Sequence, residues 1–152
     1  MTGSGTRPHL VMAEEKQQTS AQQAVHPEPL KAVLVVDDDK QLASALEWIL
    51  VDENYLVDVA FDGEEALLKV KVHEYDAIVC DLQMPRLRGD EFYVQATQLR
   101  PELAERFIFI TGHAADSHNK DFLGQQGMKH LIKPFPINDL IIAVKDLLGE
   151  HA

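Results

Sequence analysis

The segment AVLVVDDDKQLASALEWIL, residues 32–50, decides the fold class. It opens at 32–36 with a continuous apolar run rich in β-branched residues, which is typical of a strand buried on both faces. The spacing of an amphipathic helix follows, and its predicted buried face is Leu42, Ala45, Leu46, Ile49 and Leu50. A buried strand followed by such a helix is the βα unit from which parallel sheets are built.

The rest of the chain repeats this unit. Apolar runs predict further strands at 56–60, 77–80, 107–110 and 128–132. Between them, one helix should begin at Asp62, whose spacing to Glu65 resembles a capping box, and the next should end before Pro101. Another covers 115–126, has a weak apolar face and should end at Gly127. The predicted buried positions of the other helices are Ala66, Leu67 and Val70; Phe92, Ala96 and Leu99; and Ile137, Leu140, Ile141, Val144, Leu147 and Leu148.

Strands that alternate with helices in this way predict an α/β fold. The sheet should be doubly wound, five-stranded and parallel, because right-handed crossovers place helices on both of its faces. The common solution at this size is the flavodoxin-like (βα)5 arrangement with strand order 2-1-3-4-5. Its ligand crevice lies outside the carboxyl ends of the first and third strands, where the strand order reverses.

Length and composition bound the domain organisation. With 152 residues, 45% of them hydrophobic, the chain has room for one domain of common size. We expect residues 31–150 to form it. Residues 1–30 carry no sustained apolar period and are predicted to be a flexible N-terminal tail.

The net charge and the cysteine content limit the classes of partner and the cellular compartment that we expect for this protein. The formal net charge of -11 repels phosphate backbones, so we expect no direct contact with nucleic acid. The single cysteine, Cys80, excludes an intrachain disulfide and fits a reducing compartment. No apolar stretch approaches the roughly 20 residues of a spanning helix, and the N-terminus lacks the apolar core of a signal peptide. We therefore expect a soluble cytoplasmic protein with no membrane partner.

Polar residues stand where four of the predicted strands end. They are Asp37 and Asp38, Asp81, Thr111 and Lys133. Because the carboxyl ends of parallel strands lie at the same edge of a sheet, acids, a hydroxyl and an ammonium should share one crevice. Converging carboxylates repel one another and should either protonate or recruit a cation, and ligation by oxygen alone favours Mg²⁺.

The acid at position 81 has the setting of a nucleophile. Asp81 directly follows the apolar run Ala-Ile-Val-Cys and should point into the crevice. A carboxylate there could attack a phosphorus centre and form an aspartyl phosphate. Mg²⁺, Lys133 and the Thr111 hydroxyl would then neutralise the phosphoryl oxygens. The set of residues predicts phosphoryl transfer.

The motifs VVDDDK (35–40), DLQMPRLRG (81–89), ITGHA (110–114) and IKPF (132–135) carry these residues. In their order and spacing, the chain resembles a response-regulator receiver domain, the phosphoacceptor module of two-component signalling. The resemblance covers about residues 31–150. It implies that Asp81 is the phosphoacceptor, that Thr111 and Lys133 bind phosphoryl oxygens, and that the Mg²⁺ ligands are Asp37, Asp38, Asp81 and the backbone carbonyl of Gln83.

The resemblance also implies partners and a switch. The phosphodonor would be a sensor histidine kinase or a histidine phosphotransfer protein. The domain would assist its own phosphorylation and dephosphorylation without being a true enzyme. The face made by its fourth helix, fifth strand and fifth helix would carry the signal, and a phosphorylation-dependent homodimer could form there by analogy.

Three further positions bear on this resemblance. The switch pair would be Thr111 and position 130, which is usually Tyr or Phe in the family and is His130 here. His113 follows Thr111 by two residues, at the mouth of the site, where it could influence attack of water on the acyl phosphate. The Lys133–Pro134 peptide bond is expected to be cis.

Two other functions stay open on the sequence. The DDD run also offers Asp37 and Asp39 to a Mg²⁺-dependent phosphohydrolase of the haloacid-dehalogenase type, although no acidic pair follows Lys133. A receiver fold kept as a phosphorylation-independent binding module is the second alternative, and His130 is the residue that favours it. Asp39 itself has the position of a helix-start residue, so it is left out of the receiver-type site.

Overall fold

The structure is a computed structural model that describes residues 29–112, 116–125 and 127–150. Most of the predicted tail, residues 1–28, lies outside the described residues, as do His113, Ala115 and Gln126. The strands are β1 (Ala32–Val36), β2 (Leu56–Ala60), β3 (Ala77–Asp81), β4 (Phe107–Thr111) and β5 (Lys129–Ile132). The helices are α2 (Lys40–Asp52), α3 (Gly63–Val72), α4 (Gly89–Leu99), α5 (Ser117–Gln125) and α6 (Ile137–Leu147), together with the short 3-10 helix η2 (Pro101–Glu105).

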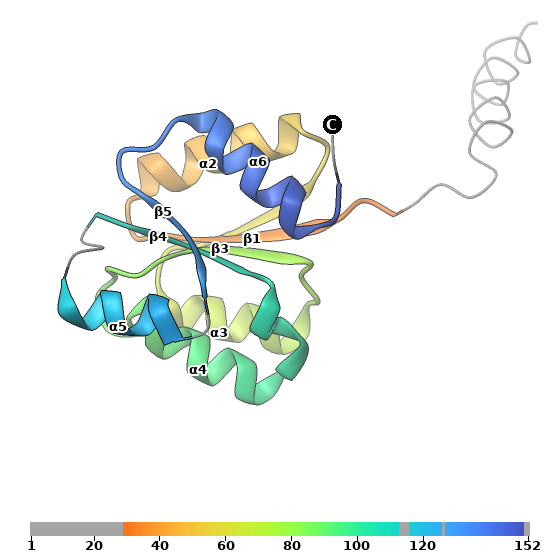
Figure 1. The fold of residues 1–152 in the computed structure, drawn as a ribbon. Helices are drawn as coiled ribbons and strands as arrows, with labels where there is room; N and C mark the ends of the chain where they lie inside the picture. Colours follow the sequence, from red (N-terminus) through yellow and green to blue (C-terminus); the bar gives the residue numbers. More distant parts are fainter. Residues whose placement is uncertain (1–28, 113–115, 126, 151–152) are drawn as a thin grey trace, which may run out of the picture.

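The strands form one parallel sheet in the order β2-β1-β3-β4-β5, as predicted. Helices α2 and α6 cover one face, and α3, α4 and α5 cover the other (Figure 1). The register pairs Val36 with Cys80, and Asp81 with Ile110. The ends of β1, β3 and β4 are therefore level at the carboxyl edge of the sheet, where the site residues follow.

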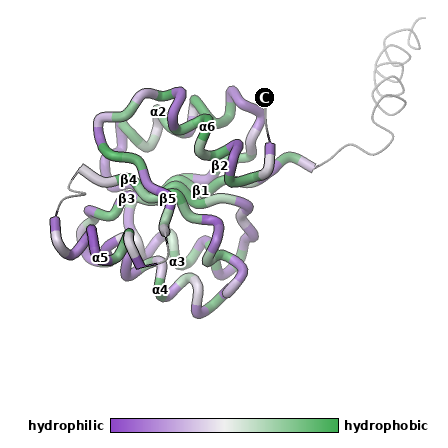
Figure 2. Tube along the Cα trace, in the orientation of Figure 1, coloured by the Kyte–Doolittle hydropathy of each residue, from purple (hydrophilic) through white to green (hydrophobic). Residues whose placement is uncertain are grey.

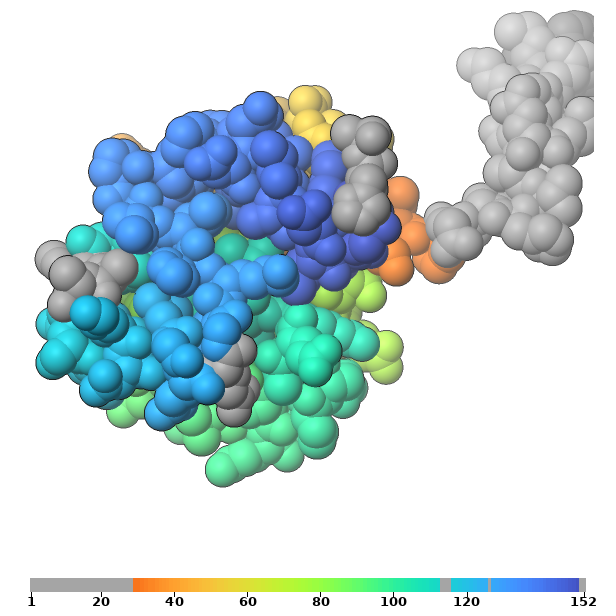
Figure 3. Space-filling view, in the orientation of Figure 1, coloured from red at the N-terminus to blue at the C-terminus, as the bar shows by residue number. Residues whose placement is uncertain are grey.

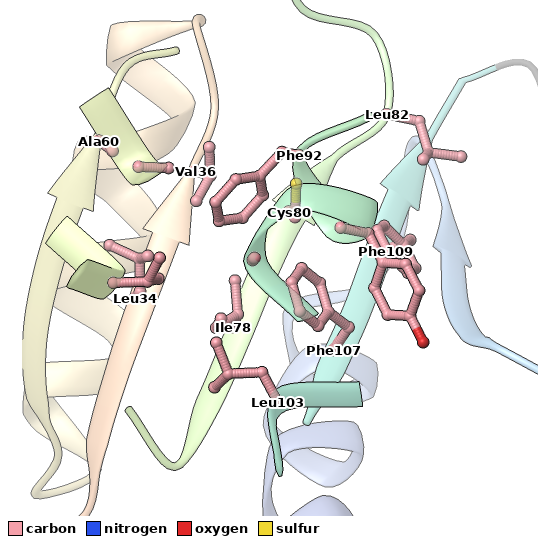
Figure 4. Close-up of a cluster of buried hydrophobic side chains, with 14 of the residues drawn as sticks. Leu34, Val36, Ala60, Ile78, Cys80, Leu82, Phe92, Leu103, Phe107 and Phe109 are labelled. Atoms are coloured by element: carbon pink, nitrogen blue, oxygen red, sulfur yellow. The ribbon is translucent and has the colours of Figure 1, made fainter. Parts of the chain in front are cut away.

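The core lies on both faces of the sheet. Strands β3 and β4 are buried along their whole length, and the apolar colour in Figure 2 is concentrated in the centre of the molecule. Beneath α3 and α4 the core is aromatic, with Phe92, Phe107 and Phe109 around Cys80 (Figure 4). The ring of Phe122 lies 5.1 Å from that of Phe109, so an aromatic contact anchors α5 to the sheet.

Burial differs from the prediction at one position in each of three helices: Ala45 in α2, Leu99 in α4 and Ile137, which is 43% exposed in the first turn of α6. Ala43 is buried in α2, whereas Ala45 is exposed. At 3.6 residues per turn, Ala45 lies about 200° around the helix from Ala43, on the side away from the sheet. Leu99 was predicted to be buried but is 49% exposed, because α4 ends there and the chain turns into η2 at Pro101. The 3-10 helix itself was not predicted.

Helix starts follow the predicted capping chemistry. The side chain of Asp39 accepts hydrogen bonds from the backbone amides of Gln41 and Leu42, each at 3.1 Å, and so begins α2. Asp62 accepts from the amide of Glu65 at 2.8 Å. The Glu65 carboxylate accepts in return from the amide of Phe61, one residue before the usual position of a capping box, at 2.8 Å.

The loop from β3 to α4 packs against its own strand. A Cβ atom on Gly89 would lie 2.3 Å from the carbonyl oxygen of Asp81 and 2.8 Å from Cα of Leu82. The amide of Gly89 donates to the Leu82 carbonyl at 3.2 Å. Gly63, at the start of α3, is tight against the same loop, since its Cβ would lie 2.6 Å from the Leu87 carbonyl oxygen. Glycine is therefore needed at both positions to seat the loop that follows Asp81.

We predict that Gly89→Ala lowers the free energy of unfolding by about 1 to 3 kcal/mol, because the new methyl group must displace backbone atoms. Gly124→Ala is the control, since a Cβ there meets no atom within 4 Å and alanine favours the helix. Urea denaturation of both variants would test this. Equal stability of Gly89→Ala and wild type would contradict the tight packing of this loop.

Candidate functional site

Three carboxylates meet where β1 and β3 end. Oxygen atoms of Asp37, Asp38 and Asp81 all lie within 4.8 Å of one another. Asp37 and Asp81 are buried, with exposed fractions of 1% and 3%, whereas Asp38 faces solvent. Buried negative charges this close together are unfavourable unless positive charge compensates for them.

The Lys133 ammonium supplies part of that charge. Its Nζ lies 3.0 Å from Asp81 Oδ2, to which it donates a hydrogen bond, and 3.8 Å from Asp37 Oδ2. Burial alone would lower the pKa of Lys133, but the hydrogen bond to Asp81 and the charges of Asp81 and Asp37 raise it above its ordinary value. Lys133 therefore stays positively charged.

Backbone amides fix the orientation of both buried acids. Asp81 Oδ1 accepts from the amide of Gln83 at 2.9 Å, so each of its oxygens has a donor. Asp37 Oδ1 accepts from the amide of Asp39 at 2.9 Å. Among the buried side-chain nitrogen and oxygen atoms of the described residues, Asp37 Oδ2 is the one that lacks a hydrogen bond. An unsatisfied carboxylate oxygen beside two other acids is an arrangement that suits a hard cation.

The protonation of Asp37 reflects its burial and the acids beside it. Burial, together with the negative charges of Asp81 and Asp38, raises the pKa of Asp37 to about 7, although the amide of Asp39 and the ammonium of Lys133 oppose the rise. Near neutral pH, this acid is divided between its two protonation states. The residues present therefore fit a divalent, oxygen-preferring metal such as Mg²⁺, which would remove this penalty.

Thr111 ends β4 and is completely buried. Its carbonyl accepts a hydrogen bond from the amide of Lys133 at 2.8 Å, which ties the end of β4 to the residue that carries the ammonium. Asn119, from the first turns of α5, donates from Nδ2 to the Thr111 hydroxyl oxygen at 3.5 Å. Arg88, just before α4, donates to Oδ1 of Asn119 at 3.1 Å.

Sequence reasoning missed Asn119 and Arg88. Asn119 lies three and four residues before Phe122 and Leu123, and all three are buried. An asparagine on the apolar face of a helix was the signal that could have identified it. Arg88 gave no comparable signal, because its contact with Asn119 joins the loop before α4 to helix α5, 31 residues further along the sequence.

The structure brings together Asp37, Asp38, Asp81 and Lys133, and it places the other predicted residues as follows. The amide of Gln83 contacts Asp81, and the side chain of Gln83 is half-buried. His130 is exposed on β5, with Nδ1 3.3 Å from the Met128 carbonyl oxygen. His113 lies outside the described residues. The Lys133–Pro134 bond is cis, as the resemblance implied.

The third acid of the DDD run has a different role. Asp39 is exposed, and its carboxylate caps α2 through two backbone amides. The metal-competent cluster found among the described residues contains Asp81 and not Asp39. This geometry does not favour the D-x-D arrangement that a hydrolase of the haloacid-dehalogenase type requires. Among the described residues, no helix has the length and apolar character needed to cross a bilayer.

Comparison with known proteins gives concordant matches. A family model described as the response regulator receiver domain matches residues 33–145. The chain is 32% identical over 116 residues to the response regulator ArlR of Staphylococcus aureus, a match that covers 76% of this chain and 52% of ArlR. The chain thus spans about half the length of this curated relative.

Solved structures with the same fold include three receiver domains. A CheY-like response regulator receiver domain protein of Methanospirillum hungatei superposes with a TM-score of 0.72 at 30% identity, over 80% of this chain and 95% of that one. The receiver domain of a Francisella response regulator superposes with a TM-score of 0.67 at 32% identity, over 78% of this chain and 97% of that one. The receiver domain of a sensor histidine kinase from Pseudomonas aeruginosa superposes with a TM-score of 0.71 at 25% identity, over 80% of this chain and 100% of that one. The structure of that domain has a magnesium ion coordinated in the active site cleft.

We predict that Asp37→Asn raises the free energy of unfolding at pH 8, in the absence of divalent metal, by about 1 to 3 kcal/mol, because it removes a buried and incompletely paired charge. The folded-state pKa lies above the ordinary value of 3.8, so the folded protein binds this proton first as the pH falls. Wild type should therefore gain stability between pH 8 and pH 5, and the difference from the variant should shrink. Asp38→Asn, at an exposed carboxylate, is the control and should have little effect.

We predict that Asp39→Ala destabilises the protein by about 1 kcal/mol through loss of the α2 cap, while Mg²⁺ affinity stays nearly unchanged. Asp37→Ala should abolish Mg²⁺ binding. Isothermal titration calorimetry and urea denaturation on the same two variants would separate the effects. A loss of Mg²⁺ affinity in Asp39→Ala as large as in Asp37→Ala would show that Asp39 belongs to the metal site.

Proposed function

The chain belongs to the response regulator receiver domain family of two-component signalling, and we propose that Asp81 is its phosphoacceptor. Receiver domains are phosphoacceptor signalling modules rather than classical enzymes. The observation that carries the assignment is the buried Asp81 carboxylate, held at 3.0 Å from the Lys133 ammonium inside a cluster of acids. We place the domain at residues 31–150.

Hydrogen bonds at both oxygens prepare Asp81 for phosphoryl transfer. The Gln83 amide and the Lys133 ammonium hold the carboxylate in one orientation, so little motion is needed before attack. A carboxylate oxygen forms a bond to phosphorus as the bond from phosphorus to the donor breaks, and the donor leaves with its electron pair. The product is an aspartyl phosphate, and the donor takes up a proton from solvent.

The remaining residues neutralise the charge of the phosphoryl group. Lys133 can transfer its hydrogen bond from the Asp81 carboxylate to a phosphoryl oxygen, because the two acceptors are attached to the same side chain. Thr111 can donate its hydroxyl proton to a second oxygen from the adjacent strand end. Transfer of this kind is catalysed mainly by positioning and electrostatics, so fixed donors of this type suffice.

Receiver domains bind Mg²⁺ in the active site, and the acid cluster of this chain fits that ion. Asp37, Asp38, Asp81 and the backbone carbonyl of Gln83 would hold it. When bound, Mg²⁺ supplies charge neutralisation between the acids and the phosphoryl oxygens. The orphaned Oδ2 of Asp37 supports its use as a ligand.

Receiver domains interact with histidine kinases, and the phosphodonor proposed here is a phosphohistidine of a sensor kinase or of a histidine phosphotransfer protein. The output surface that we propose is the face formed by α5, β5 and α6, which Figure 3 shows in shades of blue. Exposed His130 and Ile142 line a shallow groove between β5 and α6 on this face. Phosphorylation-dependent pairing of two copies through this face is part of the proposal.

We predict that wild type gains one phosphoryl group on incubation with Mg²⁺ and acetyl phosphate and that Asp81→Asn gains none, as read by intact-protein mass spectrometry. Asp52→Asn, an exposed acid at the end of α2, is the matched control and should be phosphorylated like wild type. Lys133→Met should slow the reaction by roughly 100-fold or more, because the positive charge beside Asp81 is lost. An adduct on Asp81→Asn would overturn the assignment of Asp81.

A further inference from the structure

A chain of hydrogen bonds leads from the active-site hydroxyl to the start of α4. Arg88 donates from Nη2 to Asn119 Oδ1 at 3.1 Å, and Asn119 donates from Nδ2 to Thr111 Oγ1 at 3.5 Å. Thr111 and Asn119 have exposed fractions of 0% and 1%. A polar pair this deeply buried is retained only when hydrogen bonds compensate for lost hydration.

Arg88 determines which way the Asn119 amide faces. An asparagine side chain can present either its oxygen or its nitrogen to a neighbour, and the hydrogen-bond network decides between them. A guanidinium has five donors and no acceptor, so the amide oxygen must face Arg88. The amide nitrogen then faces Thr111 as a donor. The Thr111 oxygen accepts on that side, and its own proton is directed away from Asn119.

We propose that Arg88 and Asn119 are positioning residues that orient the Thr111 hydroxyl as a donor to the phosphoryl group on Asp81. The proposal rests on the proposed function of Thr111 and adds the two residues that set its direction. All the bonds run the same way, from the Arg88 cation through Asn119 to Thr111, so each donor polarises the next. A chain of this polarity suits an anionic acceptor at its end.

Arg88, at the outer end of this series of hydrogen bonds, is also held in place. Asp90 accepts from Arg88 Nε at 3.2 Å through Oδ1, and its Oδ2 lies 2.6 Å from His118 Nε2. The backbone amide of Arg88 donates to the Glu91 carboxylate at 2.9 Å, which holds the residue at the start of α4. Arg88 therefore has partners on α4 and α5 and is held in one place relative to both helices.

Asn119→Asp tests the direction of the chain with almost no change in shape. The carboxylate keeps its partner Arg88, but it cannot donate to Thr111 and instead attracts the hydroxyl proton. We expect the initial rate of phosphorylation by acetyl phosphate to fall roughly ten- to 100-fold at fixed Mg²⁺. Thermal unfolding monitored by circular dichroism would verify that the variant is folded.

The decisive comparison repeats Asn119→Asp in a Thr111→Ala background. If Asn119 acts through the hydroxyl, the second substitution should change the rate of Thr111→Ala by less than about twofold. An equal fall in both backgrounds would mean that the new negative charge repels the phosphodonor directly, and it would overturn the proposal. An unchanged rate for Asn119→Asp in the wild-type background would overturn it as well.

Arg88→Leu gives the same test without a change inside the core. Arg88 has a side chain that is 35% exposed, and its loss should slow phosphorylation severalfold only when Thr111 is present. Arg86→Leu is the matched control, because it removes the same charge from the same loop, where Arg86 pairs with Asp62 instead. Equal effects of the two arginine substitutions would contradict the role of Arg88. A normal rate for Thr111→Ala, or uptake by Asp81→Asn, would instead refute the proposed function.

Discussion

Two buried carboxylates beside one ammonium are the electrostatic constraint on which the rest of this structure depends. Lys133 contacts Asp81 at 3.0 Å and Asp37 at 3.8 Å, so one positive charge faces two buried negative charges, with exposed Asp38 beside them. Burial, together with the neighbouring negative charges, raises the pKa of Asp37, and its Oδ2 has no hydrogen bond among the described residues. Apolar side chains in place of these charged groups would make the folded protein more stable. The arrangement is therefore useful only if the site binds a cation or a charged ligand.

The strand order brings these groups together. β1 and β3 are neighbours in register at Val36 and Cys80, which puts the next residues, Asp37 and Asp81, side by side. Lys133 directly follows the edge strand β5 and reaches Asp81 past the end of β4, because β4 pairs with β5 at Thr111 and Ile132. The hydroxyl of Thr111, at the end of β4, contacts Asn119 on α5. Four distant parts of the chain meet in one crevice through sheet topology alone.

A feature of this structure could be predicted from the sequence when it depends on residues that are close together in the sequence. The strands, the sheet order and the acid cluster were predictable, because buried runs and the residues that end them are local patterns. In α2 the buried leucines Leu46 and Leu50 were predicted correctly, but Ala45 was predicted in place of Ala43, because a small alanine side chain marks a helix face only weakly. Arg88 and Asn119 were missed for a different reason. Their contact depends on how the loop after β3 lies against α5, and no periodicity records that relation.

The site therefore has carboxylates on one side, at the ends of β1 and β3, and hydrogen-bond donors on the other, from the ends of β4 and β5 and from α5. A ligand shifts a two-state element only to the extent that its contacts differ between the two states. Charge added at Asp81 can affect α5 through such a difference, because Asn119 on that helix contacts the Thr111 hydroxyl. α5 buries three residues, and one of them is Asn119, so part of what holds this helix in place is polar and sensitive to the site. A helix held by Phe122 and Leu123 alone would lack that dependence, and its position would be indifferent to the charge on Asp81.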